Sequence, residues 1–204
     1  MAQYAAETEN TAYTAPAVAN PSPLGLSAFA LTTFVLSTIA AGWFPVGATS
    51  IIVGLAIFYG GLGQLLAGMW EFRTGNTFGA TAFTSYGAFW LSFGAISIPG
   101  FNVAATLGGA LHQALGIYFL AWAIFTAIML VGALKSNIAL IALFAFLTLT
   151  FLSLAIGELA GSTAFHTLGG YLGVITALVA WYTALAGLLS SGRAAFSLPV
   201  GPIS

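Results

Sequence analysis

The sequence has almost no charge and no cysteine. Its 204 residues include three Lys or Arg and four Asp or Glu, which give 3% charged residues and a net charge of -1. So few cations form no basic patch that could neutralise nucleic-acid phosphates, which excludes nucleic acid as a partner. Without cysteine there is no disulfide framework, no thiolate nucleophile and no cysteine metal site.

Apolar residues dominate instead. They make up 60% of the chain, a composition from which no soluble globular surface can be built. Because a helix needs about 20 apolar residues to cross a bilayer, we predict an all-α membrane protein, a bundle of six transmembrane helices. Runs such as 138–146 lack the alternation typical of barrel strands, which favours helices. The predicted spans are 24–41, 46–70, 78–98, 110–134, 138–159 and 168–190.

The first residues differ in composition from the spans. Residues 1–19 contain Glu7 and Glu9 but neither Lys nor Arg, and they lack the apolar region of a signal peptide. Their Ala, Thr and Pro content cannot bury enough apolar area to offset the entropy of ordering. We therefore expect a disordered N-terminal tail over 1–19, a six-helix transmembrane domain over 20–192 and a short C-terminal tail over 193–204.

The positions of the cations predict the orientation in the membrane. Arg73 follows the second span, Lys135 the fourth and Arg193 the sixth, so all three fall on one face. The positive-inside rule makes that face cytoplasmic. We therefore predict a multi-pass protein of the cell membrane with both termini in the cytoplasm.

Two carboxylates lie at or near the lipid. Glu71 ends the second span, where it either pairs with Arg73 or lines a pore. Glu158 has no Lys or Arg within local reach, and an unpaired carboxylate in lipid costs several kcal/mol, so it is expected to face water or share a proton. His112 and His166 lie at the outer ends of spans, either as parts of a proton-sensing vestibule or simply solvated. Their spacing matches no helix-borne zinc motif, so no metal is expected.

Hydroxyl and amide residues recur at helical spacing inside two spans. Thr81 and Thr84 belong to a stripe in the third span, and Gln64 shares a stripe with Glu71 in the second. Two interpretations remain open: hydroxyls bonded to carbonyls of the preceding turn at packed interfaces, or the lining of a pore. Small residues four apart, which favour close helix packing, occur at Gly157 with Gly161 and at Gly169 with Gly173.

The segment Asn20-Pro21-Ser22-Pro23 precedes the first span. Asn is a strong N-cap, and Pro is tolerated in a first turn whose amides have no intrahelical partner. A helix start that faces a cavity offers N–H groups and partial positive charge to an anion. This matters because neither Lys nor Arg lies inside a predicted span.

Several blocks of the sequence resemble one known family. Residues 20–26 read NPSPLGL, similar to the NPAPLGL signature of the acetate uptake transporter family, which includes bacterial acetate/succinate permeases. Further blocks agree in order up to about Tyr182. The sequence departs from the bacterial pattern at two positions. It has Ser22 where the bacterial permeases have Ala, and Glu158 where they have Asn. The agreeing blocks are IFYGG from Ile57 with Gln64 and Ala67-Gly68, GNTFG from Gly75 after Glu71, TAFTSYG from Thr81 with Phe89-Trp90, and AIG from Ala155 with Ala160-Gly161.

The resemblance implies a six-helix protomer with its own pore, a homo-hexamer in the lipid bilayer, and passage of acetate and, in some members, succinate. It implies a constriction formed by Phe29, Tyr86 and Leu147, and neither a cofactor nor an enzymatic activity. Together with the patterns above, the candidate pore residues are Asn20, Thr33, Gln64, Glu71, Thr81, Thr84, Tyr86 and Glu158.

Other functions fit the sequence less well. An intramembrane protease needs a nucleophile setting that Ser162 with His166 lacks. A water or glycerol channel would use two Asn-Pro helix caps, and Asn-Pro occurs only at Asn20. Three possibilities stay open: a channel, a proton-coupled carrier of the same carboxylates, and a structural or receptor-like membrane protein that transports nothing.

Overall fold

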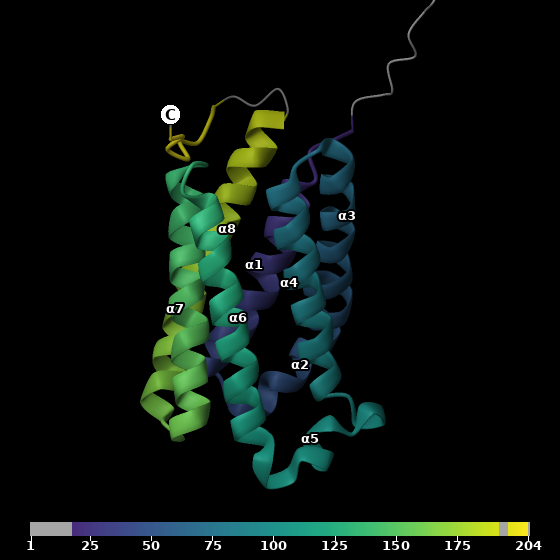
Figure 1. The fold of residues 1–204 in the computed structure, drawn as a ribbon, viewed down its shortest axis with the longest axis vertical. Coiled ribbons are helices and arrows are strands. Elements are labelled where there is room, and N and C mark those ends of the chain that lie inside the picture. Colours follow the sequence, from purple (N-terminus) through teal and green to yellow (C-terminus); the bar gives the residue numbers. More distant parts are fainter. Residues whose placement is uncertain (1–17, 192–195, 204) are drawn as a thin grey trace, which may run out of the picture.

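A computed structural model describes residues 18–191 and 196–203. Most of the predicted tail 1–19, with Glu7 and Glu9, lies outside the described residues, as does Arg193. The described part is a bundle of long helices (Figure 1). In chain order the elements are α1 (Ser22–Ala40), η1 (Val46–Ser50), α2 (Ile51–Ile57), η2 (Phe58–Gly63), α3 (Gln64–Thr74), α4 (Thr77–Ile96), η3 (Pro99–Phe101), α5 (Val103–Leu107), η4 (Gly108–Ala110), α6 (Leu111–Ala133), α7 (Ile138–Ala160) and α8 (Thr163–Ser191).

Most of the long helices have the length and composition to cross a membrane. Five stretches of the described chain qualify: Ser22–Ala40, Val46–Thr74, Val103–Ala133, Ile138–Ala160 and Thr163–Ser191. The helix α4 is also long, with 20 residues, but it is not among these five stretches. The prediction of an all-α membrane protein is confirmed, with five or six long apolar helices.

Three details differ from the sequence prediction. The predicted last span begins at residue 168, but α8 begins at Thr163, because the turn after α7 needs only Gly161 in the left-handed conformation (φ 60°) and Ser162. Gly161 therefore caps α7. A Cβ there would meet nothing within 4 Å, so Gly161 does not share a close helix contact with Gly157, although the spacing predicted one. The second span also contains a π-helical segment, η2, which a regular 3.6-residue pattern does not predict.

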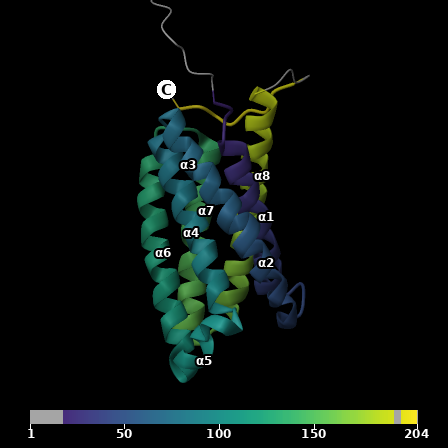
Figure 2. The same cartoon turned by 90° about the vertical axis from the view of Figure 1, so that its right-hand side faces the viewer.

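The helices pack in two groups joined by α1. The helix α8 contacts α1 and α7, α7 contacts α6, and α3 contacts α4; Figures 1 and 2 show α1 between α8 and the α3–α4 pair. The predicted small residue Gly173 allows close approach, since a Cβ there would lie 2.2 Å from Oγ of Ser37 in α1. Between α4 and the α6–α7 pair the space is filled by aromatic rings, including Phe89, Trp122 and Phe151.

The two ends of the bundle differ. One end holds the start of α1, the α3–α4 turn, the α6–α7 turn and the end of α8, and the opposite end holds α5 (Figure 1). We call the first the Arg73 end, because Arg73 closes α3 there, and Lys135 lies at the same end in the α6–α7 turn. These two cations thus share one face, as predicted. The assignment of that face to the cytoplasm stays a prediction.

Candidate functional site

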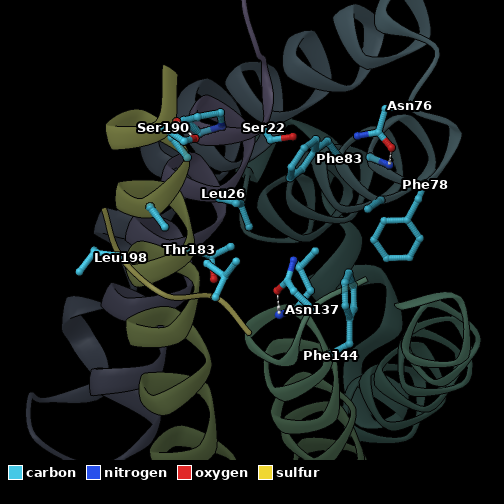
Figure 3. A pocket seen from close by; sticks show the side chains of 17 residues that line it. Ser22, Leu26, Asn76, Phe78, Phe83, Asn137, Phe144, Thr183, Ser190 and Leu198 are labelled. Carbon is cyan, nitrogen blue, oxygen red and sulfur yellow. Dashed lines mark hydrogen bonds between the residues drawn. The ribbon is translucent and has the colours of Figure 1, made fainter. Parts of the chain in front are cut away.

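A cavity of about 310 Å³ lies at the Arg73 end. We call it the vestibule. Its walls come from α1, α4, α7 and α8 and from residues 198 and 200, which follow α8. Figure 3 shows polar side chains from different helices turned toward this space. These polar lining residues are Ser22, Asn76, Asn137, Thr183 and Ser190.

Three helices begin at the vestibule. Asn76 caps α4, with its Oδ1 accepting a hydrogen bond of 3.0 Å from the amide of Gly79. Asn137 caps α7 in the same way, accepting from the amide of Leu140 at 2.9 Å. The third helix, α1, begins at Ser22. Each start carries a partial positive charge of roughly half an elementary charge. Among the lining elements only α8 ends here, so the helix dipoles together favour an anion in the vestibule.

A much smaller cavity of about 20 Å³ lies deeper in the bundle. It shares the lining residues Leu26, Ala82, Phe83 and Phe144 with the vestibule, so the two are neighbours along one path. Its other lining residues are Phe29, Gln64, Tyr86, Leu143 and Leu147. A space of this size admits about one water molecule. The path is therefore narrow here, and we call this point the constriction.

The predicted trio of Phe29, Tyr86 and Leu147 comes together at the constriction. All three side chains are buried, with exposed fractions of 4%, 2% and 2%. The ring centroids of Phe29 and Tyr86 lie 5.8 Å apart. The Tyr86 hydroxyl donates a hydrogen bond of 2.9 Å to Oγ1 of Thr126 in α6, which fixes the ring in place. The three side chains thus form a mostly apolar narrowing, in which a hydrogen bond fixes the Tyr86 ring.

Some buried side-chain polar atoms have no hydrogen-bond partner within the described part of the chain. Gln64 Oε1 lies at the constriction itself. Thr33 lies one helical turn after Phe29 in α1, and Trp90 lies one turn after Tyr86 in α4. Residues one turn apart share a helix face, so Thr33 and Trp90 continue these two faces toward the α5 end. Since buried polar groups are almost always paired, such atoms indicate places for water or a polar solute. The unpaired atoms are Thr33 Oγ1, Gln64 Oε1, Thr84 Oγ1 and Trp90 Nε1.

Thr81 and Asn20 are predicted pore residues that lie away from this path. Thr81 is exposed on α4, and its hydroxyl donates to the carbonyl of Thr77 at 2.8 Å, the packing interpretation of the hydroxyl stripe. Asn20 is exposed and is not the N-cap of α1, which is Pro21. Its Oδ1 instead accepts from the amide of Ser22 at 3.0 Å. A proline at the cap leaves Asn20 one position too early to cap the helix.

Glu71 is buried behind the vestibule wall, with 1% of its surface exposed. It is not paired with Arg73. It accepts hydrogen bonds from the Ser22 hydroxyl, from Thr74 Oγ1 at 3.2 Å and from Asn76 Nδ2 at 2.8 Å. Ser22 and Asn76 both line the vestibule, while Glu71 does not. Glu71 therefore positions two vestibule side chains and joins the start of α1 to the α3–α4 turn.

Glu158 lies at the opposite end of the bundle and has two histidine partners. His112 Nδ1 is 2.6 Å from Glu158 Oε2, and His166 Nε2 is 3.3 Å from Oε1. The Glu158 side chain is 9% exposed, while His112 is 77% exposed. This cluster joins α6, α7 and α8. The two histidines are the partners of Glu158, which has neither Lys nor Arg nearby in the sequence.

Sequence reasoning missed part of the vestibule. Asn76 and Asn137 each precede an apolar run, and this N-cap signal could have placed them at helix starts. Ser22 was noted only as a departure from the family signature. No sequence pattern pointed to Thr183, or to residues 198 and 200, because their place depends on how the chain folds back after α8.

The chain is similar to a known family and to known proteins. It matches the GPR1/FUN34/yaaH family over residues 3–204. It is 46% identical over 195 residues to acetate permease A of Emericella nidulans, covering 89% of this chain and 65% of the relative. It is 40% identical over 185 residues to the succinate-acetate/proton symporter SatP of Escherichia coli K12, covering 90% of this chain and 96% of SatP.

A solved structure shares the fold. The structure of the bacterial acetate channel SatP superposes with a TM-score of 0.80 at 40% identity, covering 91% of this chain and 100% of SatP. The chain spans less than two thirds of the first curated relatives it matches, 61% of accumulation of dyads protein 2 of Saccharomyces cerevisiae and 65% of acetate permease A.

Proposed function

Because this chain belongs to the GPR1/FUN34/yaaH family, we propose that it passes acetate and related small carboxylates, such as succinate, through a pore within each protomer. One observation carries the proposal: the vestibule and the constriction lie within a single chain and share lining residues. It accords with the names of its relatives, which are an acetate permease and a succinate-acetate/proton symporter.

The vestibule attracts the anion without a fixed cation. The starts of α1, α4 and α7 supply partial positive charge, and the side-chain amide of Asn137 supplies N–H donors. An anion held by Arg would leave slowly, whereas weak donors suit rapid passage. Glu71 does not line the vestibule, and its oxygens accept hydrogen bonds from Ser22, Thr74 and Asn76.

The constriction sets the size of what passes. Stripping water from an isolated carboxylate is costly, so polar groups must replace the lost hydrogen bonds. Gln64 lies at the narrow point, where its Nε2 amide group can donate, and Thr33 and Trp90 have unpaired donors one helical turn further along. The rings of Phe29 and Tyr86 must shift for acetate to cross, because the space at this point holds about one water molecule and acetate has more heavy atoms than water.

The setting in the membrane follows from charge and resemblance. With Arg73 and Lys135 at the vestibule end, the positive-inside rule places the vestibule and both termini in the cytoplasm. A homo-hexamer, with one pore in each protomer, follows from the family resemblance. Tyr86, Phe29 and Leu147 then control each pore separately.

Flux into liposomes tests the proposal. Purified protein in liposomes should take up labelled acetate faster than protein-free liposomes, the necessary control because neutral acetic acid crosses lipid unaided. No added flux would favour the structural or receptor-like alternative. Protein-dependent accumulation against a gradient, driven by an imposed pH difference, would indicate a proton-coupled carrier, and flux only down the gradient would indicate a channel.

A further inference from the structure

Residues 196–203 fold back from α8 onto the start of α7. We call them the strap. The amide of Ile138 donates to the carbonyl of Gly201 at 2.9 Å, and the amide of Ala139 donates to the carbonyl of Val200 at 3.1 Å. Amides in a first helical turn have no partner within the helix. The strap thus satisfies two donors of α7 next to its Asn137 cap.

Other contacts fix the strap more firmly. The hydroxyl of Tyr182 in α8 donates to the carbonyl of Pro199 at 2.6 Å, and the amide of Ile203 donates to the carbonyl of Ser136 at 3.1 Å. Gly201 has φ +67°, and a Cβ on it would lie 2.9 Å from Cδ1 of Ile138. A side chain at this position would be strained and would push the strap away from α7.

The strap contributes two side chains to the vestibule. Leu198 and Val200 line it, and both are half-buried. Figure 3 shows the strap passing beside the vestibule, with Leu198 on the same side as Thr183. Both contributions are apolar, while Asn76 and Asn137 offer side-chain N–H groups at the starts of α4 and α7.

We propose that the strap selects monocarboxylates over dicarboxylates at the vestibule. This rests on the proposed function. The polar groups can solvate one carboxylate while Leu198 and Val200 contact a methyl group, as in acetate. A second carboxylate, as in succinate, would lose water against these apolar side chains and gain no hydrogen bond in return.

The test changes polarity and keeps shape. Leu198→Asn combined with Val200→Thr retains the approximate volume of both side chains and the backbone bond of Val200. Succinate and acetate fluxes are measured on the same liposome preparations. The ratio of succinate to acetate flux should rise about fivefold, the factor that one net hydrogen bond supplies. The matched control is Phe196→Asn, since Phe196 lies on the strap, is 62% exposed and is not among the vestibule-lining residues.

A second variant covers the case in which the double variant does not fold. Gly201→Val should displace the strap and raise the same ratio. Its control is Gly47→Val at the opposite end, where a Cβ would meet nothing within 4 Å. If acetate flux persists and the ratio stays at the parent value in the variant that folds, the strap is not a selectivity element. If the parent itself passes no acetate, it is the proposed function that fails.

Discussion

Replacing Tyr86 or Phe29 by Ala should let larger monocarboxylates through. The constriction has about 20 Å³ of free volume, so the size of a passing acid is set by how far these rings must move. Lactate has two more heavy atoms than acetate. Forcing an extra group into a well-packed site costs about 1–3 kcal/mol, and each 1.36 kcal/mol is a factor of ten in rate. Removing the ring should therefore raise the lactate to acetate flux ratio by about 5- to 150-fold.

The assay compares competing fluxes in liposomes containing equal amounts of folded protein. Truncating a buried Phe to Ala costs about 3–5 kcal/mol of stability, so the control must carry the same penalty. Phe119→Ala serves, because Phe119 is 5% exposed but lines neither the vestibule nor the constriction. Its flux ratio should stay at the parent value.

The reasoning is refuted if both aromatic variants fold, reach the membrane and keep the parent's preference among acids. The trio of Phe29, Tyr86 and Leu147 would then be packing alone. A rise in the ratio for Phe119→Ala equal to that of Tyr86→Ala would also refute it, since loosening of the bundle would then explain both.

Three more predictions follow from the same structure. Gln64→Ala should lower acetate flux without changing the size ranking of acids, because it removes a polar group but neither ring; a changed ranking would place Gln64 among the size-determining side chains. Glu158→Gln should flatten the pH dependence of acetate uptake, since it removes the carboxylate that His112 and His166 share; an unchanged pH profile, with protein still in the membrane, would make the cluster structural. In this cysteine-free chain, Asn102→Cys should react with an impermeant thiol reagent from outside the cell and Thr74→Cys only from inside; labelling of Thr74→Cys from outside would overturn the orientation.

The sequence alone determined the membrane class and most helices. A transmembrane helix satisfies its own backbone hydrogen bonds, so each span can be recognised from a local apolar run. The start of α7 at Ile138 agrees with the predicted span. The start of α8 did not, because Thr163, His166 and Thr167 are polar although they already belong to the helix.

The tertiary structure decided which polar groups meet. Ser22 lies 49 residues from its partner Glu71, and His112 lies 46 residues from Glu158. No local pattern encodes such pairs, since they depend on which helices pack together and at what height. The resemblance pointed to Phe29, Tyr86 and Leu147, but only the packing of α1, α4 and α7 brings them around one narrow space. In the same way, residues 196–203 have no pattern of their own, and they become a vestibule wall because the first amides of α7 need acceptors that the helix cannot supply.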